Sequence, residues 1–175
     1  MIEGFKLPKV TFRTREFDES KMEYYWQDKN TDDYFKGKRV VLFSLPGAFT
    51  PTCSTYQLPG FEETYDKIRN QDIDEIYCIS VNDAFVMNAW FKDQNVQKVK
   101  AIGDGEGVFT QGMGMLVNKP KQGFGMRSWR YSMLVDNGEV VKVFEEPGKN
   151  NASDDDDPFT VSDAETMIKY LQENK

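Results

Sequence analysis

One cysteine of this chain lies where a thiol is readily ionised. Cys53 follows residues 39–45, an apolar run bounded by turn residues that is typical of a buried strand. The segment from Cys53 to about Arg69 is predicted to be a helix, so the sulfur lies at its N-terminus. Unpaired backbone N–H groups and the positive end of the helix dipole favour an anionic sulfur there. The local sequence predicts a reactive thiolate, with an inert buried thiol as the alternative for Cys53 taken alone.

The composition limits how such a thiolate can be activated. The chain contains two cysteines and no histidine. The absence of histidine excludes Cys-His and Ser-His nucleophilic arrangements and most zinc sites. Two cysteines do not make a disulfide framework, and few cysteines are more often free or catalytic thiols. Activation must then come from the helix terminus and a fixed cation, for which arginine is the natural supplier.

Length and charge limit the number of domains and the kinds of partner that this chain can have. The 175 residues, 39% of them hydrophobic, suit one compact domain over residues 1–175. The net charge of −7 argues against a nucleic-acid or anionic-membrane partner, because both would present phosphate to an acidic surface. Residues 1–6 lack the apolar core of a signal peptide, and no segment approaches the roughly 18 apolar residues of a membrane span. We expect a cytoplasmic protein.

Strand and helix patterns alternate along the chain and end in an antiparallel pair. Asp83 is a predicted N-cap for a helix that continues to about Lys92. Asn137-Gly138 is a strong turn signal between two strands. This order favours an α/β sandwich. The predicted strands are 10–13 and 24–26 in an N-terminal hairpin, then 39–45, 76–81, 99–102, 131–135 and 139–144.

The residues around Cys53 resemble the active site of peroxiredoxins. Pro46, Thr50 and Cys53 fit Pro-x-x-x-Thr-x-x-Cys, the pattern around the peroxide-reactive cysteine of that family. The resemblance is to the type II or peroxiredoxin-five branch, including the peroxiredoxin domain of bacterial peroxiredoxin–glutaredoxin hybrids, and it covers roughly residues 4–172. Other matching segments are Leu58-Pro59-Gly60-Phe61, Ser80-Val81-Asn82-Asp83, Phe85-Val86-Met87, Trp129-Arg130-Tyr131-Ser132-Met133, Pro158-Phe159 and Val161-Ser162-Asp163-Ala164.

The resemblance implies a fold and an activity. The fold is a thioredoxin fold, with a central mixed sheet flanked by helices and an N-terminal β-hairpin extension. The activity is the reduction of hydrogen peroxide and small alkyl hydroperoxides through a cysteine sulfenic acid, without metal, haem or flavin. A redox-sensing or chaperone-like interaction protein that uses oxidised Cys53 is the second hypothesis, and fast peroxide turnover separates the two. A structural module with an inert cysteine ranks last.

Four residues acquire roles from the resemblance. Cys53 would be the nucleophile, and Arg130 would stabilise its thiolate and the developing oxyanion with a rigid fork of N–H groups. The Thr50 hydroxyl would contact the peroxide, and Pro46 would narrow the pocket and exclude water. Taken singly, Thr50 and Pro46 could also be turn residues. Arg127 is the competing arginine, and we expect it to give outer support or to pair with a carboxylate.

Cys78 has two interpretations. Its surroundings resemble plant type II enzymes, in which a second cysteine at this place has been considered the resolving partner. The favoured alternative is a small apolar residue inside a central strand. A disulfide requires Cα atoms closer than about 7 Å, so Cys78 could reach Cys53 only if the helix start unwound. Without that movement, an outside thiol would resolve the sulfenic acid.

The C-terminal part offers no substitute sulfur. Animal relatives carry a resolving cysteine in the loop before the last helix, where this chain has residues 150–157 with four aspartates. A solvated, self-repelling loop is predicted there, with calcium binding as a remote alternative. No Cys-x-x-Cys motif is present, and we expect no fused glutaredoxin domain. We therefore predict reduction in trans by glutathione with glutaredoxin, with thioredoxin as the second choice.

Three smaller expectations concern the surroundings of the site. Gln57 stands where many relatives place histidine, and it is expected to affect the contact with the reductant more than peroxide chemistry. Residues 162–165 fit a capping box that starts the final helix. Members of this branch pair through loops around the active site, so we expect a homodimer whose contact includes Phe49.

Overall fold

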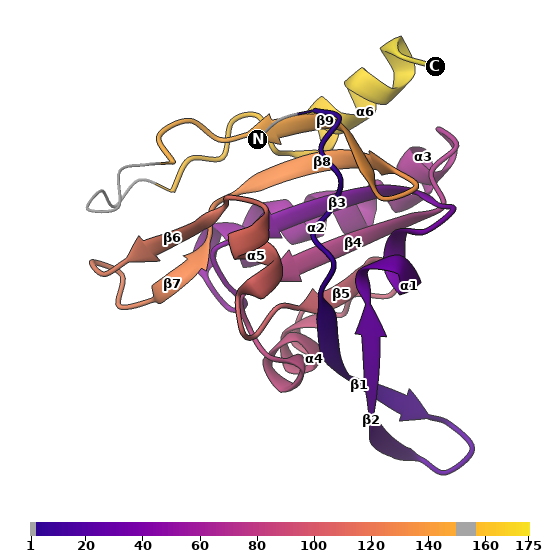
Figure 1. Cartoon of the computed structure of the whole chain (residues 1–175), viewed down its shortest axis with the longest axis vertical. Coiled ribbons are helices and arrows are strands. Elements are labelled where there is room, and N and C mark those ends of the chain that lie inside the picture. Colours follow the sequence, from indigo (N-terminus) through magenta and orange to yellow (C-terminus); the bar gives the residue numbers. More distant parts are fainter. Residues whose placement is uncertain (1–2, 150–156) are drawn as a thin grey trace.

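The centre of the protein is a five-stranded mixed sheet. The computed structural model describes residues 3–149 and 157–175. The strand order is β5-β4-β3-β8-β9, with β3, β4 and β5 parallel and β8 antiparallel to both of its neighbours (Figure 1). The bounds are β3 Arg39–Leu45, β4 Glu75–Ser80, β5 Lys100–Gly103, β8 Tyr131–Asp136 and β9 Glu139–Glu145.

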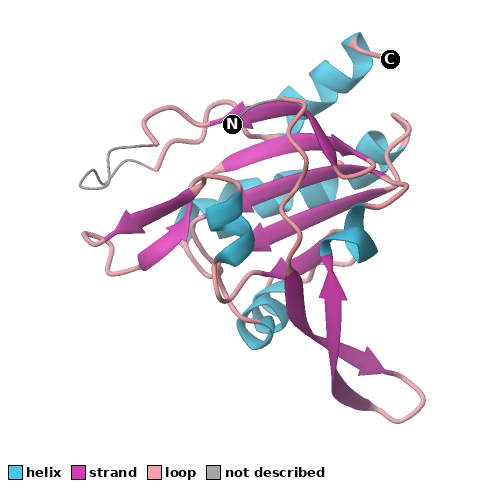
Figure 2. Ribbon diagram, in the orientation of Figure 1, coloured by secondary structure: helices cyan, strands magenta, loops and turns pink. Residues whose placement is uncertain are grey.

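Helices cover both faces of this sheet (Figure 2). Side chains of β3 alternate between two apolar cores, with Val41 and Phe43 in one and Val40 and Leu42 in the other. Burial of both faces explains why β3 and β4 have continuous apolar sequences. The first core packs against η1 (Cys53–Gln57), α2 (Leu58–Glu63), α3 (Tyr65–Arg69), α4 (Ala84–Asp93) and α6 (Ala164–Glu173). The second packs against α1 (Thr31–Phe35) and α5 (Val108–Gly112).

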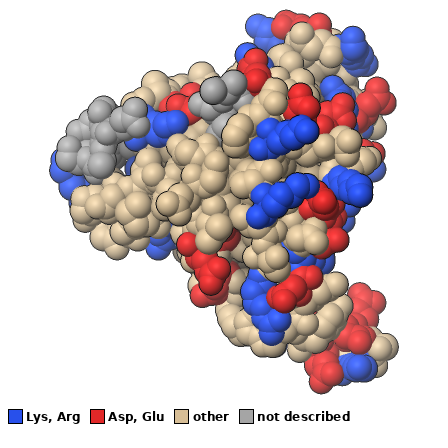
Figure 3. Space-filling model, in the orientation of Figure 1, with Lys and Arg blue, Asp and Glu red and all other residues tan. Residues whose placement is uncertain are grey.

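Two hairpins extend from the central body (Figure 1). The predicted N-terminal hairpin is confirmed as β1 (Thr11–Asp18) paired with β2 (Glu23–Asn30). A second hairpin, β6 (Leu116–Lys119) with β7 (Gly125–Ser128), has no counterpart among the predicted strands. Basic and acidic side chains are interspersed on the β1–β2 hairpin and around the C-terminal helix (Figure 3). Among the described helices, none reaches the length and apolarity needed to cross a bilayer.

Most of the helix caps and turns that the sequence predicts are present in the structure. Asp83 caps α4 by accepting the Val86 N–H at 2.9 Å. Asn137 and Gly138 form the β8–β9 turn with φ of 49° and 78°, as such a two-residue turn requires. The predicted capping box at residues 162–165 is wrong. The N-cap is Asp163, whose carboxylate accepts the N–H of Thr166.

Candidate active site

Cys53 lies in the first turn of the helical segment that follows β3. The turn at η1 is a π-helix, in which the N–H of Leu58 donates to the carbonyl of Cys53. Pro59 accounts for the wider turn, because its ring would clash with the Thr55 carbonyl in a regular α-helix. The ring of Phe61 stacks on Phe43 of β3 with centroids 4.1 Å apart and holds this helix on the sheet. The predicted helix over residues 53–69 is confirmed in part: it begins with the π-turn at the cysteine and is interrupted at Thr64, between α2 and α3.

The Cys53 thiol is completely buried and contacts Arg130. The Nη2 of Arg130 donates to the Cys53 Sγ at 3.4 Å. Arg130 precedes β8, and β8 runs antiparallel to β3 with Tyr131 opposite Ser44. The residue that enters β8 therefore lies beside the loop that leaves β3. Sheet topology thus brings together two residues that are far apart in the sequence.

Two polar side chains complete the surroundings of the Arg130 guanidinium. Asp157 accepts from Nη2 at 2.7 and 2.9 Å and from Nε at 3.2 Å, and Gln57 accepts from Nη1 at 2.5 Å. Burial opposes the charge of Arg130, but the charges of Cys53 and Asp157 more than offset it and raise the pKa of Arg130. The guanidinium is therefore a fixed cation beside the sulfur.

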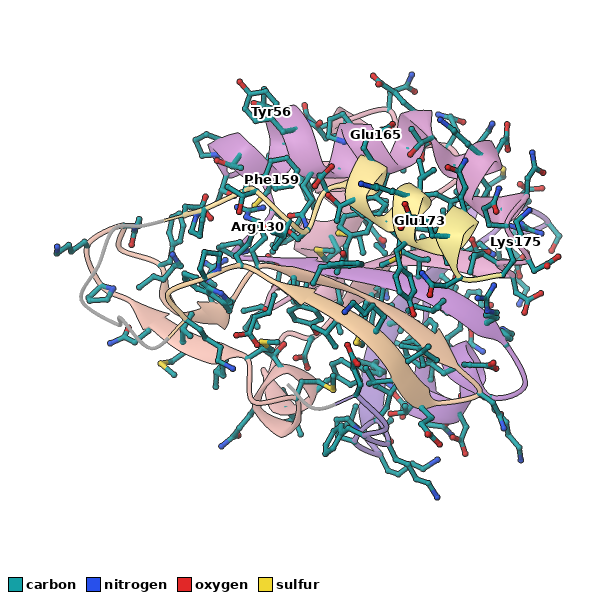
Figure 4. All side chains as sticks on the ribbon, turned by 90° about the horizontal axis from the view of Figure 1, so that it is seen from above. Tyr56, Arg130, Phe159, Glu165, Glu173 and Lys175 are labelled. Atoms are coloured by element: carbon teal, nitrogen blue, oxygen red, sulfur yellow. The ribbon has the colours of Figure 1, made fainter. Side chains whose placement is uncertain are left out.

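One aromatic ring lies over this cation, and a second ring stacks on the first. Figure 4 shows Tyr56, Phe159 and Arg130 in a row at one end of the sheet. The Arg130 Cζ lies 5.8 Å from the centroid of the Phe159 ring, within cation–π range. The Tyr56 ring stacks on the outer side of Phe159, with centroids 6.5 Å apart.

A buried carboxylate fixes the segment that carries Asp157 and Phe159. Glu146, which follows β9, accepts five hydrogen bonds of 2.7 to 2.9 Å from the backbone and hydroxyl groups of residues 160–162. Its own N–H donates to the Arg130 carbonyl at 3.1 Å. Burial opposes ionisation, yet these hydrogen bonds lower the pKa of Glu146. Glu146 therefore links the backbone of Arg130 to the segment that covers its side chain.

Thr50 and Pro46 lie in the loop between β3 and the helix. The Thr50 hydroxyl donates to the Gly47 carbonyl at 2.7 Å, which leaves its oxygen lone pairs available as acceptors. Pro46 is buried, and its carbonyl accepts from the Nη1 of Arg127 at 3.4 Å. Arg127 thus supports the loop, whereas Arg130 contacts the sulfur.

Cys78 lies in β4 on the same side of the sheet as Cys53. It pairs with Phe43 of β3 and belongs to the same apolar core as Cys53. Both thiols are free. Burial, and then the neighbouring Cys53, raise the pKa of the Cys78 thiol well above its ordinary value, although Arg130 opposes the shift. Cys78 is therefore a protonated thiol near neutral pH, and such a thiol is a weak nucleophile.

Two expectations from the sequence are wrong at this site. Asp157 is not part of a purely solvated aspartate loop, because its carboxylate holds Arg130; the other three aspartates, 154–156, lie outside the described residues. Gln57 is 1% exposed and does not face a reductant. Its amide bridges Arg130 and the carbonyl of Ser162. Only the position of Gln57, one helical turn after Cys53, could have indicated this role.

A thioredoxin-type sheet whose edge holds a buried cysteine against an arginine defines a thiol-based oxidoreductase. The family model described as Redoxin matches residues 3–168 of the chain. The chain belongs to the redoxin family and, within it, to the peroxiredoxins, which confirms the resemblance and the thioredoxin fold. As a member it is a thiol-dependent peroxidase that takes a peroxide and a reductant.

Three similar proteins illustrate this membership. A peroxiredoxin of Rhizobium etli is 56% identical over 172 residues, covering 95% of this chain and 94% of the relative. The hybrid peroxiredoxin hyPrx5 of Haemophilus influenzae is 52% identical, covering 97% of this chain and 66% of that protein. The crystal structure of the Plasmodium falciparum antioxidant protein, a 1-Cys peroxiredoxin, is 37% identical with a TM-score of 0.92, covering 98% of this chain and 100% of that one.

Replacing Glu146 by Gln tests the carboxylate that fixes the covering segment. Glu146→Gln should lower the free energy of unfolding by about 1–3 kcal/mol at pH 7, because hydrogen bonds to a buried charge are lost. The folded-state pKa of Glu146 is depressed, so this contribution is present above the ordinary carboxyl pKa of about 4.3 and is lost as pH falls through the folded value. Urea unfolding of both proteins from pH 7 to pH 3 measures this.

The exposed Glu165→Gln on α6 is the matched control, since it removes the same charge at the surface. Its stability difference from wild type should stay within about 0.5 kcal/mol. A Glu146→Gln difference that does not shrink as pH falls would contradict the assigned role.

Proposed function

We propose that Cys53 is the peroxide-reactive nucleophile and that the substrates are hydrogen peroxide and small alkyl hydroperoxides. The observation that supports this is the hydrogen bond from buried Arg130 to the Cys53 sulfur. The thiolate attacks the nearer peroxide oxygen, so an S–O bond forms as the O–O bond breaks. Sulfur is oxidised by two electrons to a sulfenic acid, and the departing oxygen takes a proton to give water or an alcohol. Charge moves from sulfur toward the departing oxygen, where hydrogen-bond donors lower the barrier.

Arg130 supplies these donors in the proposed reaction. Its guanidinium already faces the sulfur and is held by Gln57 and Asp157, so it needs no reorganisation when charge develops. Thr50 accepts from the incoming peroxide, since its own proton is directed to the Gly47 carbonyl. Buried Pro46 limits water at the sulfur. The thiolate therefore stays unsolvated in the proposed reaction.

We propose that an external thiol, not Cys78, resolves the sulfenic acid. Burial and protonation of Cys78 support this, as does the similarity to the 1-Cys peroxiredoxin from Plasmodium falciparum. A glutathione thiol condenses with the sulfenic acid, forming an S–S bond and releasing water. Glutaredoxin and a second glutathione then return Cys53 to the thiolate by exchange. The similarity to a hybrid peroxiredoxin favours this donor, with thioredoxin second.

A homodimer is the assembly that we propose. Phe49 supports it, because this aromatic side chain next to Thr50 is 54% exposed and is presented by a positive φ of 63°. A light-scattering mass equal to one chain at micromolar concentration would refute the dimer. We also propose that the protein acts in the cytoplasm.

Intact-protein mass spectrometry tests the one-cysteine mechanism. After one equivalent of hydrogen peroxide and a sulfenic-acid trap, wild type and Cys78→Ser should both carry the trap on Cys53, because the buried and protonated Cys78 thiol is a weak nucleophile. Cys53→Ser should carry none. A loss of about two daltons in wild type that is absent from Cys78→Ser would instead identify an intramolecular disulfide and refute external resolution.

Peroxide turnover separates the peroxidase from the alternative, a redox-sensing or chaperone-like protein. With glutathione and glutaredoxin present, wild type should consume many equivalents of hydrogen peroxide per chain, and Cys53→Ser should consume none above background. Thioredoxin with its reductase should support slower turnover. Consumption that stops after a single equivalent with both donors would favour the sensor.

A further inference from the structure

Asp157 helps to hold Arg130 in the proposed reaction, but the peroxide chemistry does not explain why this holding group carries a negative charge. The Asp157 carboxylate binds the Nε–Nη2 edge of Arg130, and the same Nη2 donates to Cys53. The thiolate and the carboxylate therefore share one guanidinium group. With both ionised, the group of three carries a net charge of −1.

Asp157 is the most exposed member of the group formed by Cys53, Arg130 and Asp157. The Cys53 thiol and the Arg130 side chain are 0% and 1% exposed, whereas the Asp157 side chain is 34% exposed. A solute that approaches the guanidinium from this side meets the carboxylate first. Asp157 therefore lies where it can influence which solutes reach Arg130.

The contact is built into the fold at several points. The Glu146 carboxylate fixes residues 160–162, three residues beyond Asp157. Gln57 fixes the opposite edge of the guanidinium at Nη1. The aromatic ring of Phe159 lies over the guanidinium carbon. Both partners of the ion pair are therefore fixed: Glu146 anchors the segment that carries Asp157, and Gln57 and Phe159 position Arg130.

An arginine that is buried without a counter-charge is a good binding site for small anions, because its fork of N–H groups matches their oxygens. Asp157 occupies one edge of that fork with a built-in anion. We propose that Asp157 is a specificity-determining residue, which keeps anionic oxidants away from Cys53 and Arg130 while neutral hydroperoxides enter. This inference rests on the proposed function of Cys53.

The test compares neutral and anionic reagents on the full chain at pH 7, and the alkylating pair is matched in size. Hydrogen peroxide and peroxymonosulfate form the oxidant pair, and iodoacetamide and iodoacetate form the alkylating pair. The rate of modification at Cys53 is followed by peptide mass spectrometry, and the ratio of the anionic to the neutral rate is the readout. Because it is a ratio, a general loss of reactivity does not change it.

Asp157→Asn should raise the anionic-to-neutral ratio about tenfold for both pairs, the order expected for removing one unit charge several ångströms away at a partly exposed site. Asp157→Glu should stay within about twofold of wild type, because it retains the charge. Asp157→Ser removes the same charge and replaces Asp157→Asn if that variant does not fold. The exposed Glu165→Gln is the matched control and should leave the ratio unchanged.

A ratio that is unchanged in the folded charge-removing variant would overturn the inference, even if the absolute rates fall. Alkylation and oxidation separate this failure from failure of the proposed function. If wild type does not reduce hydrogen peroxide, the proposed peroxidase is refuted, and the alkylating pair still decides whether Asp157 rejects anions.

Discussion

The site depends on one buried positive charge. A guanidinium that is 1% exposed has lost its hydration, and burying such a charge is strongly unfavourable unless partners replace the water. Arg130 finds these partners in Cys53, Gln57 and Asp157. Cys53 and Gln57 come from the two ends of η1 and Asp157 from the segment before α6, so the requirement to satisfy this charge brings η1, the start of β8 and that segment to one place.

Sheet topology provides the framework for this arrangement. The β8 strand lies antiparallel to β3 at the centre of the sheet, so the start of β8 and the end of β3 share an edge. The π-turn presents Cys53 and Gln57 on the side facing Arg130. Glu146, at the end of the neighbouring strand β9, fixes the covering segment by five hydrogen bonds. The buried carboxylate and the buried guanidinium are thus adjacent parts of one polar network.

The sequence predicts features whose causes are local. The apolar run of β3, the Asp83 cap and the Asn137-Gly138 turn each depend on residues within a few positions, and all three are present. The short β6–β7 hairpin was missed, because its strands have four residues each and lack a strong apolar alternation. The two-residue alternation of apolar and polar side chains does not by itself identify such short strands.

Features that depend on contacts between residues far apart in the sequence could not be predicted from local patterns. Asp157 belongs to a run of aspartates whose composition favours solvation, and only the folded chain brings it to Arg130. Ser162 resembles a helix cap, but the buried Glu146 carboxylate binds its hydroxyl and leaves capping to Asp163. The local strand–helix pattern indicates Cys53, whereas the roles of Thr50, Pro46 and Arg130 depend on the family motif. Arg130 contacts the sulfur of Cys53, and the other two residues lie in the adjoining loop.

The most direct test of this account is the second-order rate constant for oxidation of Cys53 by hydrogen peroxide in wild type and Arg130→Lys. Lysine keeps the charge but loses the fork of donors, so the account predicts a loss of about 10²–10³-fold. The exposed Arg13→Lys on the β1–β2 hairpin is the control and should match wild type. A folded Arg130→Lys protein that reacts within threefold of wild type, on the order of 0.7 kcal/mol, would contradict the central role of this guanidinium.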